Sequence, residues 1–121
     1  MAKSILLVDD FENTIFVTGL TLEQKGYTVF KALSGEQALK ILDLNHIDLV
    51  VTDYNMPSMN GIELSEKIKS KPGCAKLPIL ILSTETKQLV KDKAFDIGVT
   101  AWVKKPFKID QFLMIVEKTL S

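Results

Sequence analysis

The sequence predicts an α/β fold: a doubly wound sheet of five parallel strands with helices on both of its faces. Short apolar runs alternate with longer segments in which apolar residues recur at helical spacing, and this alternation is typical of βαβ units. The chain has 121 residues, of which 46% are hydrophobic and 25% charged, so we expect a single domain over residues 1–121. Right-handed crossovers cover both faces with helices, and the strand order 2-1-3-4-5 buries the first and fourth runs, which are the most apolar.

The first strand, the first helix and the second strand occupy the N-terminal quarter of the chain. Residues 5–8 (ILLV) are apolar throughout, as in a strand that is buried on both faces. A helix is expected over residues 13–25, ended by Gly26 in the left-handed conformation. Residues 27–32 alternate tyrosine and valine with a face that carries a lysine, which indicates an edge strand.

A second helix and a third strand follow. Ser34 and Gln37 fit a capping box, with the serine at the N-cap and the glutamine three residues later, and the helix that they open ends near residue 45. Residues 47–52 form the third strand. The long loop after this strand ends in Asn60-Gly61, a pair that supplies unusual backbone dihedral angles.

The C-terminal half completes the alternation of strands and helices. Pro72-Gly73 stops one of these helices, and Gly98 caps another. The expected elements are a helix over residues 62–69, a buried strand over 77–82, a helix over 87–97, a short strand over 100–103 and an amphipathic helix over 109–120.

Polar side chains with distinctive chemistry follow four of the apolar runs. Asp9 and Asp10 follow ILLV, Asp53 follows LVVT, Ser83 follows ILIL, and Lys105 follows AWVK. The carboxyl ends of parallel strands lie at one edge of the sheet, where open α/β folds bind their ligands. The predicted strand order places the crevice between the first and third strands, so Asp10 and Asp53 are expected to face each other there.

This set of side chains suits a magnesium-assisted phosphate site. Neighbouring carboxylates repel one another, and Mg²⁺ relieves the repulsion because it takes one or two carboxylates together with phosphate oxygens. Asp53 is the natural nucleophile, since a carboxylate accepts a phosphoryl group as an acyl phosphate. Lys105 offers a compact positive charge and Ser83 a hydroxyl donor. Asp9 and Asp10 alone would fit equally well as acids at the N-terminus of the first helix, and Asp53 favours the metal site.

The same residues resemble the receiver domain of two-component response regulators, of the stand-alone CheY-like type. The resemblance covers the chain from residue 3 to the last helix and implies the flavodoxin-like (CheY-like) form of the predicted sheet. The spacing from Asp53 to the serine is thirty residues and to the lysine fifty-two, as in that family. The matching motifs are VDD at 8–10, Asp53 followed by Met56-Pro57 and Gly61, then Ser83 and Lys105-Pro106-Phe107.

The resemblance implies roles for the residues of the phosphate site. Asp53 would be the phospho-acceptor, and the donor would be a phosphohistidine of a sensor histidine kinase or a phosphotransfer protein. Asp9 and Asp10 would hold Mg²⁺ together with Asp53 and the backbone carbonyl of Asn55. Lys105 would bridge Asp53 and the phosphate, joined to Pro106 by a cis peptide bond, and Ser83 would swing toward the phosphoryl group.

Three further positions match residues that modulate this family. Asn55 and Glu85 match the pair that flanks the phosphate and tunes its hydrolysis rate. Trp102 occupies the position of the switch aromatic, which turns inward when the hydroxyl residue moves. Tryptophan is larger than the tyrosine, phenylalanine or histidine that is usual there. Both a rotamer switch and a half-exposed aromatic on an edge strand therefore remain open for Trp102.

The resemblance implies a phosphorylation-dependent signalling switch. Phosphorylation would change the surface formed by the helix at 87–97, the strand at 100–103 and the helix at 109–120, where a downstream target protein would bind. Such a regulator assists its own phosphorylation and dephosphorylation, and it is not an enzyme that turns over an external substrate. We expect a cytoplasmic monomer.

Composition excludes several other classes of protein. Fifteen acids balance fifteen basic residues, all of them lysine, so no net charge or arginine points to nucleic acid. No apolar run approaches the ~20 residues that cross a bilayer, so we expect no membrane insertion. Cys74 is the single cysteine, which excludes an internal disulfide.

Three alternative functions share parts of this pattern. A small Mg²⁺-dependent phosphatase of the haloacid dehalogenase-like group would need a second acid two residues after the nucleophile, where this chain has Asn55. A flavodoxin-like electron carrier would need a first loop rich in serine, threonine and glycine instead of DDFE. A receiver-like module that binds proteins independently of phosphate would keep the fold, and phosphate uptake distinguishes it from a switch.

Overall fold

Five parallel strands form one sheet in the order β2-β1-β3-β4-β5, which confirms the predicted topology. The computed structural model describes residues 2–121. The edge strands, β2 and β5, are the first and last in this order, and the predicted edge position of β2 is confirmed. The strands are β1 (Ser4–Val8), β2 (Thr28–Ala32), β3 (Leu49–Asp53), β4 (Ile79–Ser83) and β5 (Ala101–Lys104).

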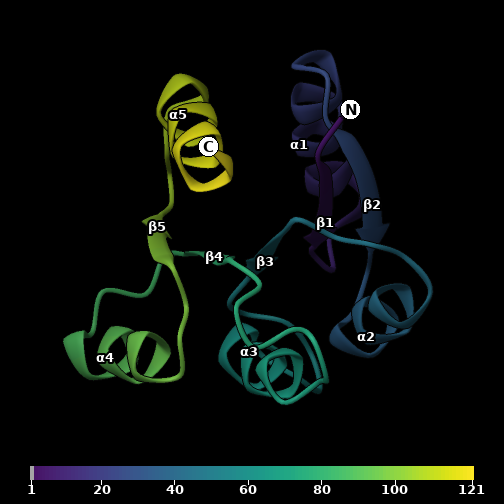
Figure 1. Cartoon of the computed structure of the whole chain (residues 1–121). Coiled ribbons are helices and arrows are strands. Elements are labelled where there is room, and N and C mark those ends of the chain that lie inside the picture. The colour runs from purple at the N-terminus through teal and green to yellow at the C-terminus, as the bar shows by residue number, and fades with distance from the viewer. Residues whose placement is uncertain (1) are drawn as a thin grey trace.

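Helices cover both faces of the sheet, as Figure 1 shows: α1 and α5 lie on one side, and α2, α3 and α4 on the other. Two helices end as predicted, since Gly26 after α1 and Gly98 after α4 both have positive φ (93° and 100°). None of the helices within residues 2–121 combines the length and the apolar character that crossing a bilayer requires. The helices are α1 (Glu12–Gln24), α2 (Gly35–Leu44), α3 (Gly61–Lys69), α4 (Gln88–Asp96) and α5 (Ile109–Leu120).

The hydrophobic core consists of two layers, one on each face of the sheet. Successive side chains of a strand point to opposite faces, so Ile5 and Leu7 join the layer under α1 and α5, whereas Leu6 and Val8 join the layer over α2, α3 and α4. Together the two layers bury β1 from Ile5 to Val8 and the whole of β3 and β4. This explains why the first run is apolar throughout instead of alternating with polar residues.

The helix starts follow the predicted capping chemistry with one difference in α2. The Ser34 hydroxyl accepts a hydrogen bond from the N–H of Gln37 at 3.1 Å, as predicted. The Gln37 side chain, however, accepts from the N–H of Leu33 at 2.6 Å instead of that of Ser34. A reciprocal capping box occurs at the start of α3, between Asn60 and Glu63.

The prediction for Asn60-Gly61 was wrong. Asn60 has φ −80° and serves as the N-cap of α3, and the residue of this loop with a left-handed φ (69°) is Ser58. Gly61 is required for a different reason: a Cβ atom there would lie 2.7 Å from the backbone oxygen of Asp53. The absence of a side chain lets α3 begin directly against the end of β3, where the Gly61 N–H donates to the Tyr54 carbonyl at 2.8 Å.

Replacing Gly61 with alanine is therefore expected to destabilise the protein by about 1–3 kcal/mol, since the new methyl group meets rigid backbone. In a helix without such a contact, the same change stabilises by about 0.5–1 kcal/mol. Urea denaturation measures the difference. Gly19→Ala in α1 is the matched control, because its closest foreign atom belongs to the flexible end of the Lys31 side chain. A Gly61→Ala variant as stable as the wild type would contradict the close-approach explanation.

Candidate functional site

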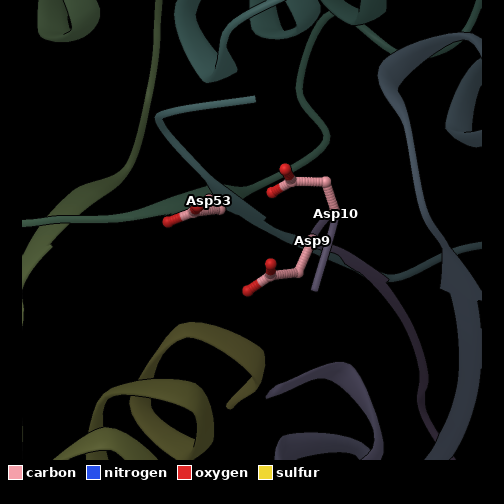
Figure 2. A group of neighbouring side chains, drawn as sticks. All are labelled: Asp9, Asp10 and Asp53. Carbon is pink, nitrogen blue, oxygen red and sulfur yellow. The ribbon is translucent and has the colours of Figure 1, made fainter. Parts of the chain in front are cut away.

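The site residues predicted from the sequence meet at the carboxyl edge of the sheet. Asp9 and Asp10 follow β1, Asp53 is the last residue of β3, Ser83 the last of β4, and Lys105 follows β5. Figure 2 shows the three acidic side chains beside one another at this edge, with their carboxylates turned the same way. The strand order alone is sufficient to bring together residues that are far apart in the sequence.

The three carboxylates form a cluster that could hold a metal ion. One oxygen from each of Asp9, Asp10 and Asp53 lies within 4.8 Å of the others. Asp9 and Asp53 are 3% and 7% exposed, so the solvent compensates little of their charge. The Oδ1 atom of Asp10 is buried and has no hydrogen-bond partner among the described residues. Oxygen atoms of this kind are the ligands that Mg²⁺ prefers, and the cluster therefore fits the expected ion.

The pKa of Asp9 shows that clustering the carboxylates disfavours the ionised form of this side chain. Burial raises the pKa of the Asp9 carboxyl above its ordinary value, and the charges of Asp53 and Asp10 raise this pKa further. A hydrogen bond from the N–H of Phe11, 2.9 Å from Asp9 Oδ1, acts in the opposite direction, as does the charge of Lys105. The net effect is a raised pKa, so Asp9 holds a proton more tightly than an ordinary aspartate and would gain from a nearby cation.

Lys105 supplies positive charge directly to Asp53. Its Nζ atom lies 2.6 Å from Asp53 Oδ1, and the two side chains are 28% and 10% exposed. The N–H of Lys105 donates to the Ser83 carbonyl at 2.8 Å, which continues the pairing of β4 and β5 beyond the end of β5. The peptide bond between Lys105 and Pro106 is cis. Lys104 is exposed, as the alternation along the strand predicts.

Ser83 is almost completely buried (1% exposed) at the end of β4. Its hydroxyl oxygen accepts a hydrogen bond from the N–H of Glu85 at 2.9 Å, and its own proton remains available for a further acceptor. The Glu85 carboxylate accepts from the N–H groups of Thr86 (3.0 Å) and Lys87 (3.4 Å) at the start of α4. The Glu85 side chain is thus bound to its own loop, while the Asn55 side chain is exposed to solvent.

Trp102 is half-buried on β5 and connects this strand to the loop after β4. Its Nε1–H donates to the backbone carbonyl of Glu85 at 3.3 Å, and its ring centroid lies 5.3 Å from that of Tyr54, with the planes tilted by 50°. No sequence pattern indicated a role for Tyr54, because contact between the two aromatics depends on the neighbouring positions of β3, β4 and β5. A continuous series of contacts therefore joins Ser83, Glu85, Trp102 and Tyr54.

The comparison with known families agrees with this geometry. Residues 5–117 match the response regulator receiver domain. The chain belongs to this family. Receiver domains bind Mg²⁺ at an acidic pocket and interact with histidine kinases or phosphotransfer proteins. They act as regulators rather than as enzymes that turn over a substrate.

Individual relatives share both sequence and structure with this receiver domain. It is 34% identical over 115 residues to the chemotaxis protein CheY of Pseudomonas aeruginosa, covering 94% of this chain and 93% of CheY. The structure of CheY4 of Vibrio cholerae superposes with a TM-score of 0.94 at 31% identity, covering 99% of this chain and all of CheY4. The regulatory protein PhoP of Bacillus subtilis is 34% identical over 88% of this chain, which spans only 44% of the length of PhoP.

The raised pKa of Asp9 predicts how stability depends on pH in the receiver domain treated with a chelator. The folded protein holds the Asp9 proton more tightly than the unfolded chain. The contribution of Asp9 to the free energy of unfolding therefore falls as the pH rises from the ordinary pKa, about 3.9, through the raised one. An asparagine in its place cannot ionise, and the amide oxygen can still accept from the N–H of Phe11. Asp9→Asn is thus expected to be more stable than the wild type at neutral pH.

The advantage of Asp9→Asn should shrink as the pH falls below the raised pKa, because the wild-type carboxyl is then neutral as well. Chemical denaturation at a series of pH values measures both curves. The exposed Asp96→Asn serves as a control for the loss of one negative charge outside the cluster. Parallel stability curves for Asp9→Asn and the wild type would show that the cluster does not disfavour ionised Asp9.

Proposed function

We propose that this receiver domain is a phosphorylation-dependent switch of two-component signalling, in which Asp53 accepts a phosphoryl group from a phosphohistidine with the help of Mg²⁺. The donor is a sensor histidine kinase or a phosphotransfer protein. One observation carries the proposal: the Asp53 carboxylate lies beside those of Asp9 and Asp10, with oxygens within 4.8 Å of one another, and the ammonium group of Lys105 is 2.6 Å from it. This arrangement provides a nucleophile together with positive charge for the phosphoryl oxygens.

In the proposed transfer, a carboxylate oxygen of Asp53 forms the bond to phosphorus while the bond between phosphorus and the histidine nitrogen breaks. Phosphoryl transfer depends mainly on positioning and on neutralising charge. Lys105 holds Asp53 in place through its 2.6 Å contact and then pairs with a phosphoryl oxygen. Asp9, Asp10, Asp53 and the backbone carbonyl of Asn55 would hold Mg²⁺, which when bound neutralises part of the charge on the phosphoryl group.

The response to phosphorylation begins at Ser83. Its hydroxyl donates to a phosphoryl oxygen, and any movement of Ser83 affects Glu85, whose N–H it accepts at 2.9 Å. Glu85 in turn holds the indole of Trp102 through its carbonyl. Trp102 thus reports phosphorylation through the loop after β4, without any need for an inward rotamer. Asn55 and Glu85, which lie on the loops beside the acceptor, tune the lifetime of the phosphorylated form.

The surface of α4, β5 and α5 is the proposed output of the switch. Movement of the loop after β4 acts directly on the start of α4, because Glu85 accepts hydrogen bonds from Thr86 and Lys87. A downstream protein that covers exposed apolar side chains on this surface would sense the change. The exposed apolar residues of the two helices are Leu89, Phe95, Ile109 and Met114.

The acceptor is tested with a small acyl phosphate such as acetyl phosphate in the presence of Mg²⁺. Wild-type protein should gain the mass of one phosphoryl group, and a chelator should prevent the gain. Asp53→Asn should take up none, because an amide is a poor nucleophile, whereas the exposed Asp96→Asn should label like the wild type.

Equal labelling of Asp53→Asn and the wild type would place the acceptor elsewhere and reject the assignment of Asp53. A wild-type chain that takes up no phosphoryl group would favour the alternative, a receiver-like module that binds its partner independently of phosphate. Release of inorganic phosphate from an external phosphomonoester would instead favour the small phosphatase.

A further inference from the structure

We infer that Met59 and Gly35 are positioning residues, and that the contact between them fixes the loop after Asp53 relative to the acids that follow β1. The inference rests on the proposed function, because it concerns the geometry of the same site. It begins with the loop between β3 and α3, residues 54–60, which carries Asn55. This loop determines where the groups beside Asp53 lie relative to Asp9 and Asp10.

Backbone hydrogen bonds fix the two ends of this loop. The N–H of Tyr54 donates to the Leu82 carbonyl at 2.9 Å, and the N–H of Gly61 donates to the Tyr54 carbonyl at 2.8 Å. Asn60 is held to α3 by its capping box with Glu63. Within residues 55–59, the hydrogen bond that the described residues show is internal, from the N–H of Met59 to the Pro57 carbonyl at 2.8 Å. Side-chain packing must therefore position the middle of the loop. Met56 and Met59 both pack against the core layer between the sheet and helices α2, α3 and α4.

Met59 packs directly on the first residue of α2. A Cβ atom at Gly35 would lie 2.6 Å from Met59 Sδ, 3.3 Å from its Cγ and 3.4 Å from its Cβ. Gly35 is not one of the residues with positive φ, so backbone geometry does not require glycine there. Glycine there instead leaves room for the Met59 side chain, which an alanine methyl group would have to displace. Beside this contact a surface hollow of 180 Å³ lies between the start of α2 and residues 57–59.

The start of α2 is also tied to the acids of β1. The N–H of Asp9 donates to the carbonyl of Ala32 at 3.1 Å, just before α2 begins. The next residue, Leu33, donates its N–H to the Gln37 side chain at 2.6 Å, which anchors the turn to the helix. The junction of β2 and α2 is therefore a common support: a hydrogen bond holds Asp9 to one side of it, and Met59 contacts the other.

The consequence concerns metal binding. The junction of β2 and α2 sets the distance between the loop after Asp53 and the acids Asp9 and Asp10. A substitution that disturbs the contact of Met59 with this junction should therefore weaken binding of a divalent ion, although every metal ligand is still present. Residues that support metal ligands from outside typically contribute about 10–100-fold to affinity. We expect about tenfold weaker binding for Gly35→Ala, whose methyl group displaces Met59, and for Met59→Ala, which removes the contact.

The experiment measures Mn²⁺ binding by electron paramagnetic resonance, with Mg²⁺ as the competitor, in four variants of the full chain. Gly35→Ala and Met59→Ala should each weaken binding, and Met59→Leu should retain it because leucine fills a similar volume. The double variant should bind like Met59→Ala alone, since the alanine methyl group has no methionine to displace. Two controls, Gly19→Ala and the exposed Met114→Ala, should bind like the wild type.

Wild-type affinity in Gly35→Ala would overturn the inference, as would an equal effect of Gly35→Ala in the presence and in the absence of Met59. The second result would mean that alanine acts through α2 itself. Urea denaturation of each variant shows whether the protein is folded, and Gly35→Ala and Met59→Leu decide the question if Met59→Ala does not fold. The variants could differ in Mn²⁺ affinity as expected while the wild type takes no phosphoryl group onto Asp53. That result would refute the proposed function and leave the inference intact.

Discussion

Mutual repulsion among three clustered carboxylates, of which those of Asp9 and Asp53 are buried, dominates the electrostatics of the site. Oxygens of Asp9, Asp10 and Asp53 lie within 4.8 Å of one another, and the raised pKa of Asp9 shows that burial and like charge both disfavour its ionised form. Lys105 compensates Asp53 through its 2.6 Å contact, whereas Asp9 and Asp10 form no such ion pair with another side chain of residues 2–121. A site of this kind gains most from a ligand that brings positive charge to the acids, which suits a transient phosphoryl acceptor.

The fold holds this cluster in place because backbone hydrogen bonds between neighbouring strands continue for one residue beyond the regular pairing. Just past the ends of the regular pairing, the N–H of Asp9 donates to Ala32, that of Tyr54 to Leu82, and that of Lys105 to Ser83, at 3.1, 2.9 and 2.8 Å. These three bonds join β1 to β2, β3 to β4 and β4 to β5 at the carboxyl edge, so the loops that carry the site residues have rigid starting points. The close approach of Gly61 to the Asp53 carbonyl then sets the direction of the loop toward α3.

Hydrophobic periodicity, the right-handed crossover rule and the burial of the most apolar runs were enough to predict the sheet, its order and the convergence of the site residues. The bounds of α5 agree with the prediction, and the apolar runs that placed the three acids and Ser83 at strand ends correspond to β1, β3 and β4. The details that failed depend on tertiary packing. Asn60-Gly61 resembles a turn in sequence and instead begins a helix. Two contacts were not predicted at all, those of Trp102 with Tyr54 and of Gly35 with Met59. Each joins residues that are far apart in the sequence, so no local pattern indicates it.

The most direct measurement of the central claim is a crystal structure grown with Mn²⁺ in place of Mg²⁺, with an anomalous difference map. The clustered acids should give one strong peak bounded by Asp9, Asp10 and Asp53, at the distance of direct coordination, which is about 2.0–2.1 Å for Mg²⁺. A peak elsewhere on the protein, or none at this edge while the carboxylates keep the same positions, would show that the clustered acids do not require a divalent cation and would contradict the account.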